Sequence, residues 1–185
     1  MLRKYSAIDL RGIRNDHYDH VVGLVGDDCD FTAVMIMPDH LRGIKDIISN
    51  KRPDVVFAQG KDLSTNRKII ESSEVDILSR PYPIDDTLAK MAQRNDKCFE
   101  ICARDIIRLK GYIKARAMQS LAKTIELAVK RDVRIVITSG ARDRLEVLTP
   151  RELVAFGVVL GFEYTRAKGA ISNVPRAFLS ERGLL

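Results

Sequence analysis

Residues 54–70 read DVVFAQGKDLSTNRKII, and this stretch holds the unit that decides the fold. It opens with the apolar, β-branched run Asp54–Ala58, a pattern typical of a short strand buried on both faces of a sheet. Asp62 then precedes Leu63 and Ile69, as expected for a carboxylate that caps the free N–H groups of a first helical turn. The stretch therefore predicts a buried strand followed by a capped helix.

The same unit repeats along the first half of the chain. Similar runs lie at Phe31–Met37, Val75–Leu78 and Lys97–Cys102, and the four runs, taken from residues 32, 54, 75 and 97, start 22, 21 and 22 residues apart. Helix signals separate them, with further candidate caps at Asp39, Asp85 and Asp86. A strand and a capped helix repeated at this interval indicate the βα units of a parallel sheet.

Further strands bracket these repeats, at Tyr5–Leu10, Val21–Val25 and Val133–Thr138. A longer helical region spans residues 104–131, and a helix capped by Thr149 spans Pro150–Leu160. Seven or so strands that alternate with helices favour an α/β fold, a compact TIM-like barrel smaller than the usual ~250 residues. An open doubly wound sheet has the same periodicity. We expect a single domain over residues 1–185.

The composition excludes several classes of protein. A hydrophobic share of 45% in 185 residues excludes a fully disordered chain. The longest uncharged apolar run, Leu153–Phe162, has ten residues, whereas a membrane-spanning helix needs ~20. The first residues contain no stretch like a secretory signal, and three cysteines are too few for a disulfide framework. We expect a cytoplasmic protein without membrane contact, with Cys98 and Cys102 as core side chains.

Positive charge is concentrated in the second half of the chain. The net formal charge is +6; residues 1–103 hold 15 Lys and Arg against 17 Asp and Glu, and residues 104–185 hold 16 against 8. Such an uneven excess favours a polyanionic partner. A basic surface that is only solvated gives the same count, so the charge alone leaves both interpretations open.

The residues that follow the predicted strands are candidates for a site, because sites in parallel α/β folds form at the carboxyl ends of strands. These candidates include Arg11, Arg104, Ser139, Arg142 and Arg144. Guanidinium groups and loop N–H groups suit phosphate oxygens. The alternative is a structural loop in which Asp143 and Glu146 pair with the arginines of that loop.

Catalytic and metal-binding patterns are weak. His17 and His20 are three residues apart in a polar stretch with no third ligand evident nearby, which disfavours a zinc or manganese site. There is no P-loop, no G-x-G-x-x-G and no paired CxxC motif. Ser139 has no histidine placed to activate it. The sequence therefore favours binding over catalysis.

The long helical region carries a row of cations. Arg116, Lys123 and Lys130 are spaced by seven residues, which is nearly two full turns, so they share one stripe of the helix at intervals of ~10 Å. The stripe lies opposite the apolar face, which comprises Ile113, Ala117, Leu121, Ile125, Ala128 and Val129. Such a row suits a nucleic-acid backbone, and a solvated helix face shows the same pattern.

Several segments resemble one known family. The densest match is Val133–Ala141, followed by Thr149–Leu153, Gly157–Glu163, Ala167–Ala170 and Pro175. Upstream, the matching residues are Ile8–Arg11, Asp62, Leu63, Asn66, Arg67, Val75–Ser79, Pro81 and Arg104. In order and spacing, these segments resemble the protein component 3 family of archaeal ribonuclease P over essentially the whole chain.

The resemblance implies a TIM-like barrel related to the PHP phosphoesterases. It also implies a non-catalytic subunit of the ribonucleoprotein that removes the 5′ leader of precursor tRNA, with the active site and Mg²⁺ on the RNA and no cofactor on this chain. The implied partners are the ribonuclease P RNA, protein component 2 and other protein subunits, with precursor tRNA contacted indirectly. Charge and resemblance together predict RNA contacts at Arg11, Arg67, Arg104, Lys114, Arg116, Lys123, Lys130, Ser139, Arg142, Arg144, Lys168 and Arg176.

Two enzymatic alternatives remain. The PHP phosphoesterases begin with a His-x-His metal motif after the first strand, and Arg11 and Ile13 stand at the corresponding positions here. This departure argues against an independent metal-dependent phosphoesterase. The other alternative is a small TIM-barrel enzyme that acts on a phosphorylated metabolite through the loop at residues 139–142.

Overall fold

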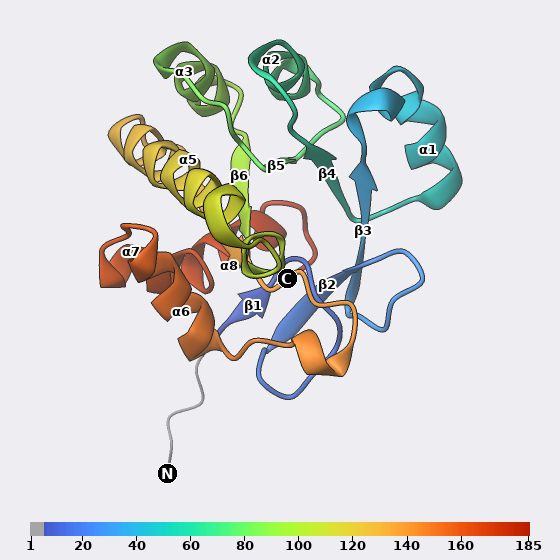
Figure 1. Ribbon diagram of the computed structural model, residues 1–185. Coiled ribbons are helices and arrows are strands. Elements are labelled where there is room, and N and C mark those ends of the chain that lie inside the picture. Colours follow the sequence, from blue (N-terminus) through green and yellow to red (C-terminus); the bar gives the residue numbers. More distant parts are fainter. Residues whose placement is uncertain (1–5) are drawn as a thin grey trace.

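Seven parallel strands form a nearly closed barrel in the computed structural model, which describes residues 6–185 (Figure 1). Each strand pairs with the next one along the chain, from β1 to β7. The strands are β1 Ile8–Asp9, β2 His20–Leu24, β3 Phe31–Ile36, β4 Val55–Gln59, β5 Ile77–Ser79, β6 Cys98–Cys102 and β7 Ile135–Thr138. The TIM-like barrel is therefore confirmed, and the open doubly wound sheet is not the fold.

Helices lie around the barrel and connect its strands from β3 onward, whereas loops join β1 to β2 and β2 to β3 (Figure 1). They are η1 Pro38–Gly43, α1 Ile44–Lys51, α2 Leu63–Glu71, α3 Asp86–Arg94, α4 Ala103–Ile107, α5 Gly111–Lys130, η2 Arg144–Glu146, α6 Pro150–Val159, α7 Tyr164–Gly169 and α8 Asn173–Ser180. None of the helices in the described residues is long and apolar enough to cross a membrane.

The core has two layers, as the period of two along a strand requires. On β4, Val55 and Phe57 belong to an inner cluster, and Val56 and Ala58 to an outer cluster between sheet and helices. Phe178 of α8 is fully buried in the inner cluster. The α8 helix therefore closes one end of the barrel.

The amino ends of the strands form the end that α8 closes. Arg182, just after α8, is ion-paired with Asp76, directly before β5. Arg134, directly before β7, lies 2.7 Å from Glu181. The opposite end, at the carboxyl ends of the strands, is not covered by α8.

The gap between β7 and β1 is bridged by the chain between α7 and α8. The Ile137 N–H donates to the carbonyl of Ala170 at 3.1 Å, and the Ile8 N–H donates to the carbonyl of Ile171 at 2.9 Å. These two residues occupy the place that an eighth strand takes in a closed barrel.

Most of the predicted helix caps are confirmed. Asp62 accepts a hydrogen bond from the Thr65 N–H at 2.8 Å, and Asp85 accepts one from the Leu88 N–H at 2.7 Å. Thr149 forms a full capping box with Glu152. The strand boundaries differ from the predicted ones by one or two residues in most cases.

Three details of the prediction are different in the structure. Asp39 caps no helix, because it lies inside the first turn of η1. The first strand is only Ile8–Asp9, and Tyr5 lies outside the described residues. Asp86 is the first residue of α3, and the cap is Asp85 alone.

The long helical region is broken in two. Lys110 has an extended backbone and Gly111 a left-handed one, with φ of 51°, so α4 ends and α5 starts in a new direction. Leu121, Ile125 and Ala128 are buried as predicted, but Ile113 is 65% exposed. Ile113 therefore does not belong to the apolar face, because the break shifts the first turn of α5 away from the barrel.

Gly60 offers a test of packing at the end of β4. A Cβ atom there would lie 2.4 Å from the carbonyl oxygen of Arg80, whereas one at Gly43 would meet nothing within 4 Å. We expect Gly60→Ala to lower the free energy of unfolding by about 1–3 kcal/mol, measured by urea denaturation. Gly43→Ala, the matched control, is expected to change it by no more than about 0.5 kcal/mol. Equal effects of the two variants would contradict the packing described.

Candidate nucleic-acid interface

Polar side chains gather at the barrel mouth, the carboxyl end of the strands. Glu100 points inward from β6 and is fully buried. Its Oε1 lies 2.8 Å from the Nε of Arg11 and accepts a hydrogen bond from the Thr138 hydroxyl at 2.6 Å. Because an unpaired buried carboxylate is costly, this contact fixes Arg11 over the interior.

Asp105 joins two arginines at the mouth. It accepts a hydrogen bond from the Nε of Arg80 at 2.9 Å, and the Nη2 of Arg11 lies 3.5 Å away. Burial acts to raise the pKa of Asp105, but the hydrogen bond from Arg80 and the charges of both arginines outweigh it and lower that pKa. Asp105 is therefore ionised and holds Arg80 and Arg11 together.

Asp9 and Ser139 form a second buried contact at the mouth. Asp9 accepts hydrogen bonds from the N–H of Arg11 at 3.2 Å, from the N–H of Ser139 at 3.1 Å, and from the Ser139 hydroxyl. Burial raises the pKa of Asp9 to about 6 despite these bonds. The Ser139 side chain is thus engaged inside the protein, and the geometry gives no support to its predicted contact with RNA.

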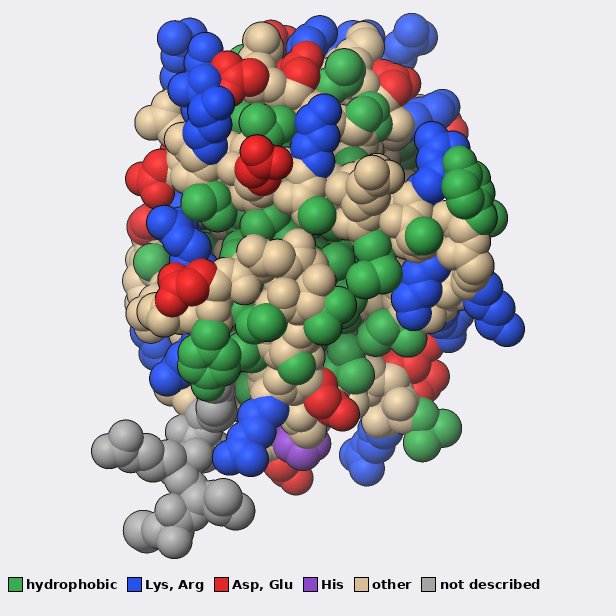
Figure 2. Space-filling model, turned by 60° about the vertical axis from the view of Figure 1, so that its left-hand side comes forward, with side chains coloured by type: hydrophobic (Ala, Val, Ile, Leu, Met, Phe, Trp, Pro, Cys, Tyr) green, Lys and Arg blue, Asp and Glu red, His purple; other side chains and the backbone are tan. Residues whose placement is uncertain are grey.

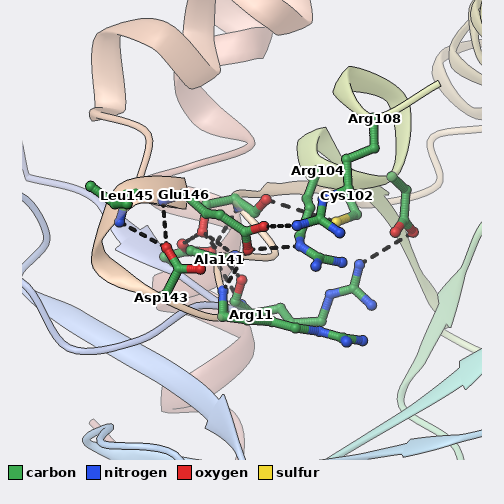
Figure 3. A network of polar contacts seen from close by, with 12 residues as sticks. Arg11, Cys102, Arg104, Arg108, Ala141, Asp143, Leu145 and Glu146 are labelled. Carbon is green, nitrogen blue, oxygen red and sulfur yellow. Dashed lines mark hydrogen bonds and ion pairs between the residues drawn. The ribbon is translucent and has the colours of Figure 1, made fainter. Parts of the chain in front are cut away.

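The loop after β7 is fastened to α4 through Glu146. Figure 3 shows Arg104 and Arg108 both reaching this carboxylate; the Nε of Arg104 donates to it at 2.7 Å. The Arg142 N–H also donates to it, at 3.0 Å. The hydrogen bond from Arg104 is the main reason that the pKa of Glu146 falls to about 2.

The alternative prediction for this loop, internal pairing of Asp143 and Glu146 with Arg142 and Arg144, holds only for the backbone N–H of Arg142, which donates to Glu146. Glu146 pairs with the arginines of α4 and its end, and Asp143 caps η2 by accepting the N–H groups of Leu145 and Glu146. Within residues 6–185, neither Arg142 nor Arg144 has an ion pair through its side chain, and both are exposed.

The basic stripe of α5 consists of Arg116, Lys123 and Lys130. All three side chains are exposed, on the side of the helix away from the buried residues. None has an ion pair within the described part of the chain; Arg116 lies over the ring of Tyr112, 5.7 Å from its centroid. Lys114, also predicted, lies half-buried on the same helix.

The remaining predicted residues lie apart from these two groups. Arg67 contacts Asp85 at 2.5 Å, and Arg176 contacts the Ser6 hydroxyl at 3.0 Å. Lys168 is exposed on α7. Glu100 was missed by sequence reasoning. A lone carboxylate inside the apolar run Lys97–Cys102 is the signal that could have identified Glu100.

The histidine pair shows no metal-site geometry. His20 lies in β2 with its ring 5.9 Å from that of Phe31. Among residues 6–185, no group of three or more His, Cys, Asp or Glu side chains is arranged to hold a metal ion. Cys98 and Cys102 are buried and unbridged, as predicted.

Comparison with known families gives a match over most of the chain. The family described as RNase P subunit p30 matches residues 34–184. The chain belongs to this family. Among curated relatives, ribonuclease P protein component 3 of Methanosarcina barkeri is 32% identical over 135 residues, and that of Thermococcus gammatolerans is 34% identical over 132 residues. These matches cover 70% and 68% of this chain.

The chain is shorter than these members of the RNase P subunit p30 family. The matches span 56% of the length of the Methanosarcina barkeri relative and 61% of that from Thermococcus gammatolerans. Among solved structures, a chain in "cryo-EM structure of archaeal Ribonuclease P with mature tRNA" superimposes with a TM-score of 0.72 and 26% identity, covering 82% of this chain and 68% of that one.

More distant structures share the fold alone. The crystal structure of A. niger ochratoxinase superimposes with a TM-score of 0.58 at 16% identity, covering 79% of this chain and 39% of that one. At this identity, the likeness supports the barrel and says nothing about the chemistry at its mouth.

Asp9 makes the stability of the fold depend on pH. Its pKa is about 6 in the folded chain against 3.8 as the ordinary value, so the folded state binds the proton more tightly. The resulting stabilisation, about 3 kcal/mol, is complete below pH 3.8 and is lost as the pH rises through 6. We expect Asp9→Asn, measured by urea denaturation from pH 4 to 8, to lack this loss. Parallel pH curves for the two proteins would contradict the burial of an ionisable Asp9.

Proposed function

We propose that this chain is a non-catalytic protein subunit of ribonuclease P, the ribonucleoprotein that removes the 5′ leader of precursor tRNA. The observation that carries the proposal is the superposition on a chain of archaeal ribonuclease P with a TM-score of 0.72. In this proposal, the RNA subunit carries the active site and its Mg²⁺, and this chain binds no cofactor. We further propose that it works in the cytoplasm.

The proposed partners are the ribonuclease P RNA, protein component 2 and other protein subunits, and precursor tRNA is contacted indirectly. The basic stripe of α5 supports the RNA contact. Its three cations are exposed and have no carboxylate partner in the described residues, so a phosphate backbone can displace counterions from them without breaking an internal ion pair.

An apolar surface supports the protein contact. Figure 2 shows apolar side chains gathered in the middle of the face that carries α5, α6 and α7, with lysines and arginines around them. An open groove of about 670 Å³ on this face is lined by Val154, Val158, Val159 and Tyr164 among others. Val159 is 70% exposed. Exposed apolar groups that lie together in this way are typical of surfaces that bind another protein.

The α5 stripe gives a direct test of the RNA contact. We expect the triple variant Arg116→Ala, Lys123→Ala, Lys130→Ala to bind ribonuclease P RNA with a flatter dependence of log affinity on log salt, by roughly 2–3 units. Each contacted phosphate contributes ~0.7–0.9 to that slope, because its counterion is released. The measurement is a binding series across salt concentrations, with and without component 2.

A matched control removes the same charge from another face. Arg42, Lys45 and Lys51 lie on η1 and α1, are exposed and have no ion pair within residues 6–185. Their replacement by alanine is expected to leave the slope of log affinity on log salt within about half a unit of the wild-type slope. An unchanged slope in the α5 variant, or an equal change in both variants, would contradict an RNA contact at the stripe.

The proposal also predicts that the RNA-free chain cleaves neither precursor tRNA nor simple phosphate esters. The carboxylates at the mouth, Glu100, Asp105 and Glu146, each contact an arginine, and Asp9 is bound to Ser139. Asp9 lies beside the Ser139 hydroxyl, but both residues are buried at 1% exposure, so this pair is closed to a substrate and does not serve as the accessible base and nucleophile that hydrolysis requires. Sustained turnover by the purified chain, abolished in Asp9→Ala, would overturn the non-catalytic assignment and favour a phosphoesterase.

A further inference from the structure

The barrel mouth contains a small hollow that the basic stripe of α5 does not include. Its cavity volume is about 40 Å³, and Arg11, Arg104 and Arg142 line it together with the backbone of Gly12 and Gly140. Figure 3 shows Arg11 beside Arg104, the loop residue Ala141 and the carboxylate of Glu146. Three arginines from three separate parts of the chain therefore line the hollow.

Carboxylates hold Arg104 through its Nε alone, and hold Arg11 through both its Nε and its Nη2. Arg104 contacts Glu146 through its Nε, and Arg11 contacts Glu100 through its Nε. Both side chains are largely buried, with 16% and 15% exposed. The terminal nitrogens of Arg104 have no hydrogen-bond partner within residues 6–185. Donor groups fixed in this way need no further ordering when an oxyanion arrives.

The local charge favours an anion. Asp27 and Asp105 also line the hollow; Asp105 is ion-paired with Arg80, whereas Asp27 accepts the N–H of Leu24 and keeps its negative charge. Arg142 is exposed at the rim and has no ion pair in the described residues. Among the residues that line the hollow, three arginines therefore face two aspartates, and Glu146, which contacts Arg104, is also paired with Arg108.

Two glycines pack tightly against buried residues beside the hollow. Gly140 has a left-handed backbone with φ of 68°, and a Cβ there would lie 2.3 Å from the Sγ of Cys102. A Cβ at Gly12 would lie 2.4 Å from the Oδ2 of Asp9. Glycine at these two positions therefore lets the backbone that lines the hollow pack directly against Cys102 and Asp9.

We propose that this hollow binds a phosphoryl group between Arg11, Arg104 and Arg142. The volume of about 40 Å³ exceeds the ~10–15 Å³ that one water occupies, and it is too small for a sugar or a base. The ligand is therefore a single tetrahedral oxyanion, either inorganic phosphate or one phosphate of an RNA backbone. The proposal stands apart from the α5 stripe and does not require that the chain act in ribonuclease P.

The test is a titration of the ¹⁵N-labelled full chain with inorganic phosphate at constant ionic strength. We expect saturable shifts of the amide signals of Gly12, Gly140 and Ala141. Arg142→Ala is expected to weaken this binding about tenfold, the loss of one charge-assisted contact. Arg144→Ala removes the same charge from the same loop outside the hollow, so we expect it to weaken binding less than about twofold.

The two sources of the phosphate are separated by competition. If RNA supplies it, a single-stranded RNA oligonucleotide without a terminal phosphate displaces inorganic phosphate from these three amides in the wild type and not in Arg142→Ala. If the ligand is free phosphate, the oligonucleotide leaves the titration unchanged. The α5 triple variant should bind inorganic phosphate like the wild type. A failure of the RNA contact at the α5 stripe is therefore distinguishable from a failure of the phosphate site. Non-saturable shifts, or equal losses in Arg142→Ala and Arg144→Ala, would overturn the site.

Discussion

Closure of a parallel barrel with seven strands is the constraint on which the rest of this structure depends. β7 and β1 do not pair with each other, and an open edge leaves backbone N–H and C=O groups without partners. Ala170 and Ile171 satisfy one group on each edge. The chain must therefore return between the two strands after α7. This return places α8 at the amino ends of the strands, with Phe178 in the inner cluster.

Because α8 closes the barrel at the amino ends of the strands, the buried polar side chains lie at the opposite end, the barrel mouth. Along β6, the inward positions change from Cys98, in the apolar inner cluster, to Glu100, which contacts Arg11. A buried carboxylate is stable only with a cation and hydrogen bonds, so Arg11 after β1 and Thr138 of β7 are drawn to the same point. The contact thereby joins the two edges of the barrel a second time, at its mouth.

Local signals in the sequence were sufficient for the strands, helices and most caps, and insufficient for the closure of the barrel and for the site. The caps at Asp62, Asp85 and Thr149 depend on neighbours three residues away, which a sequence displays directly. The pairs at the mouth join residues 94 apart, as in Arg11 and Asp105, or 42 apart, as in Arg104 and Glu146. Which residues form these pairs depends on the geometry of the barrel. The sequence could therefore indicate arginines at the strand ends but not the carboxylates that they contact. The break before Gly111 was missed for the same reason.

The two groups of cations differ in how water and salt act on them. The α5 stripe is exposed, so mobile ions screen it and its attraction falls off within ~10 Å at moderate salt. Arg11 and Arg104 are largely buried and fixed by carboxylates, which lowers screening and removes the entropy cost of ordering them. The stripe is therefore suited to attract an extended polyanion from a distance, and the mouth to hold one phosphate at a defined position. A single chain can in this way provide both the salt-dependent and the position-specific part of the contact with one polyanionic partner.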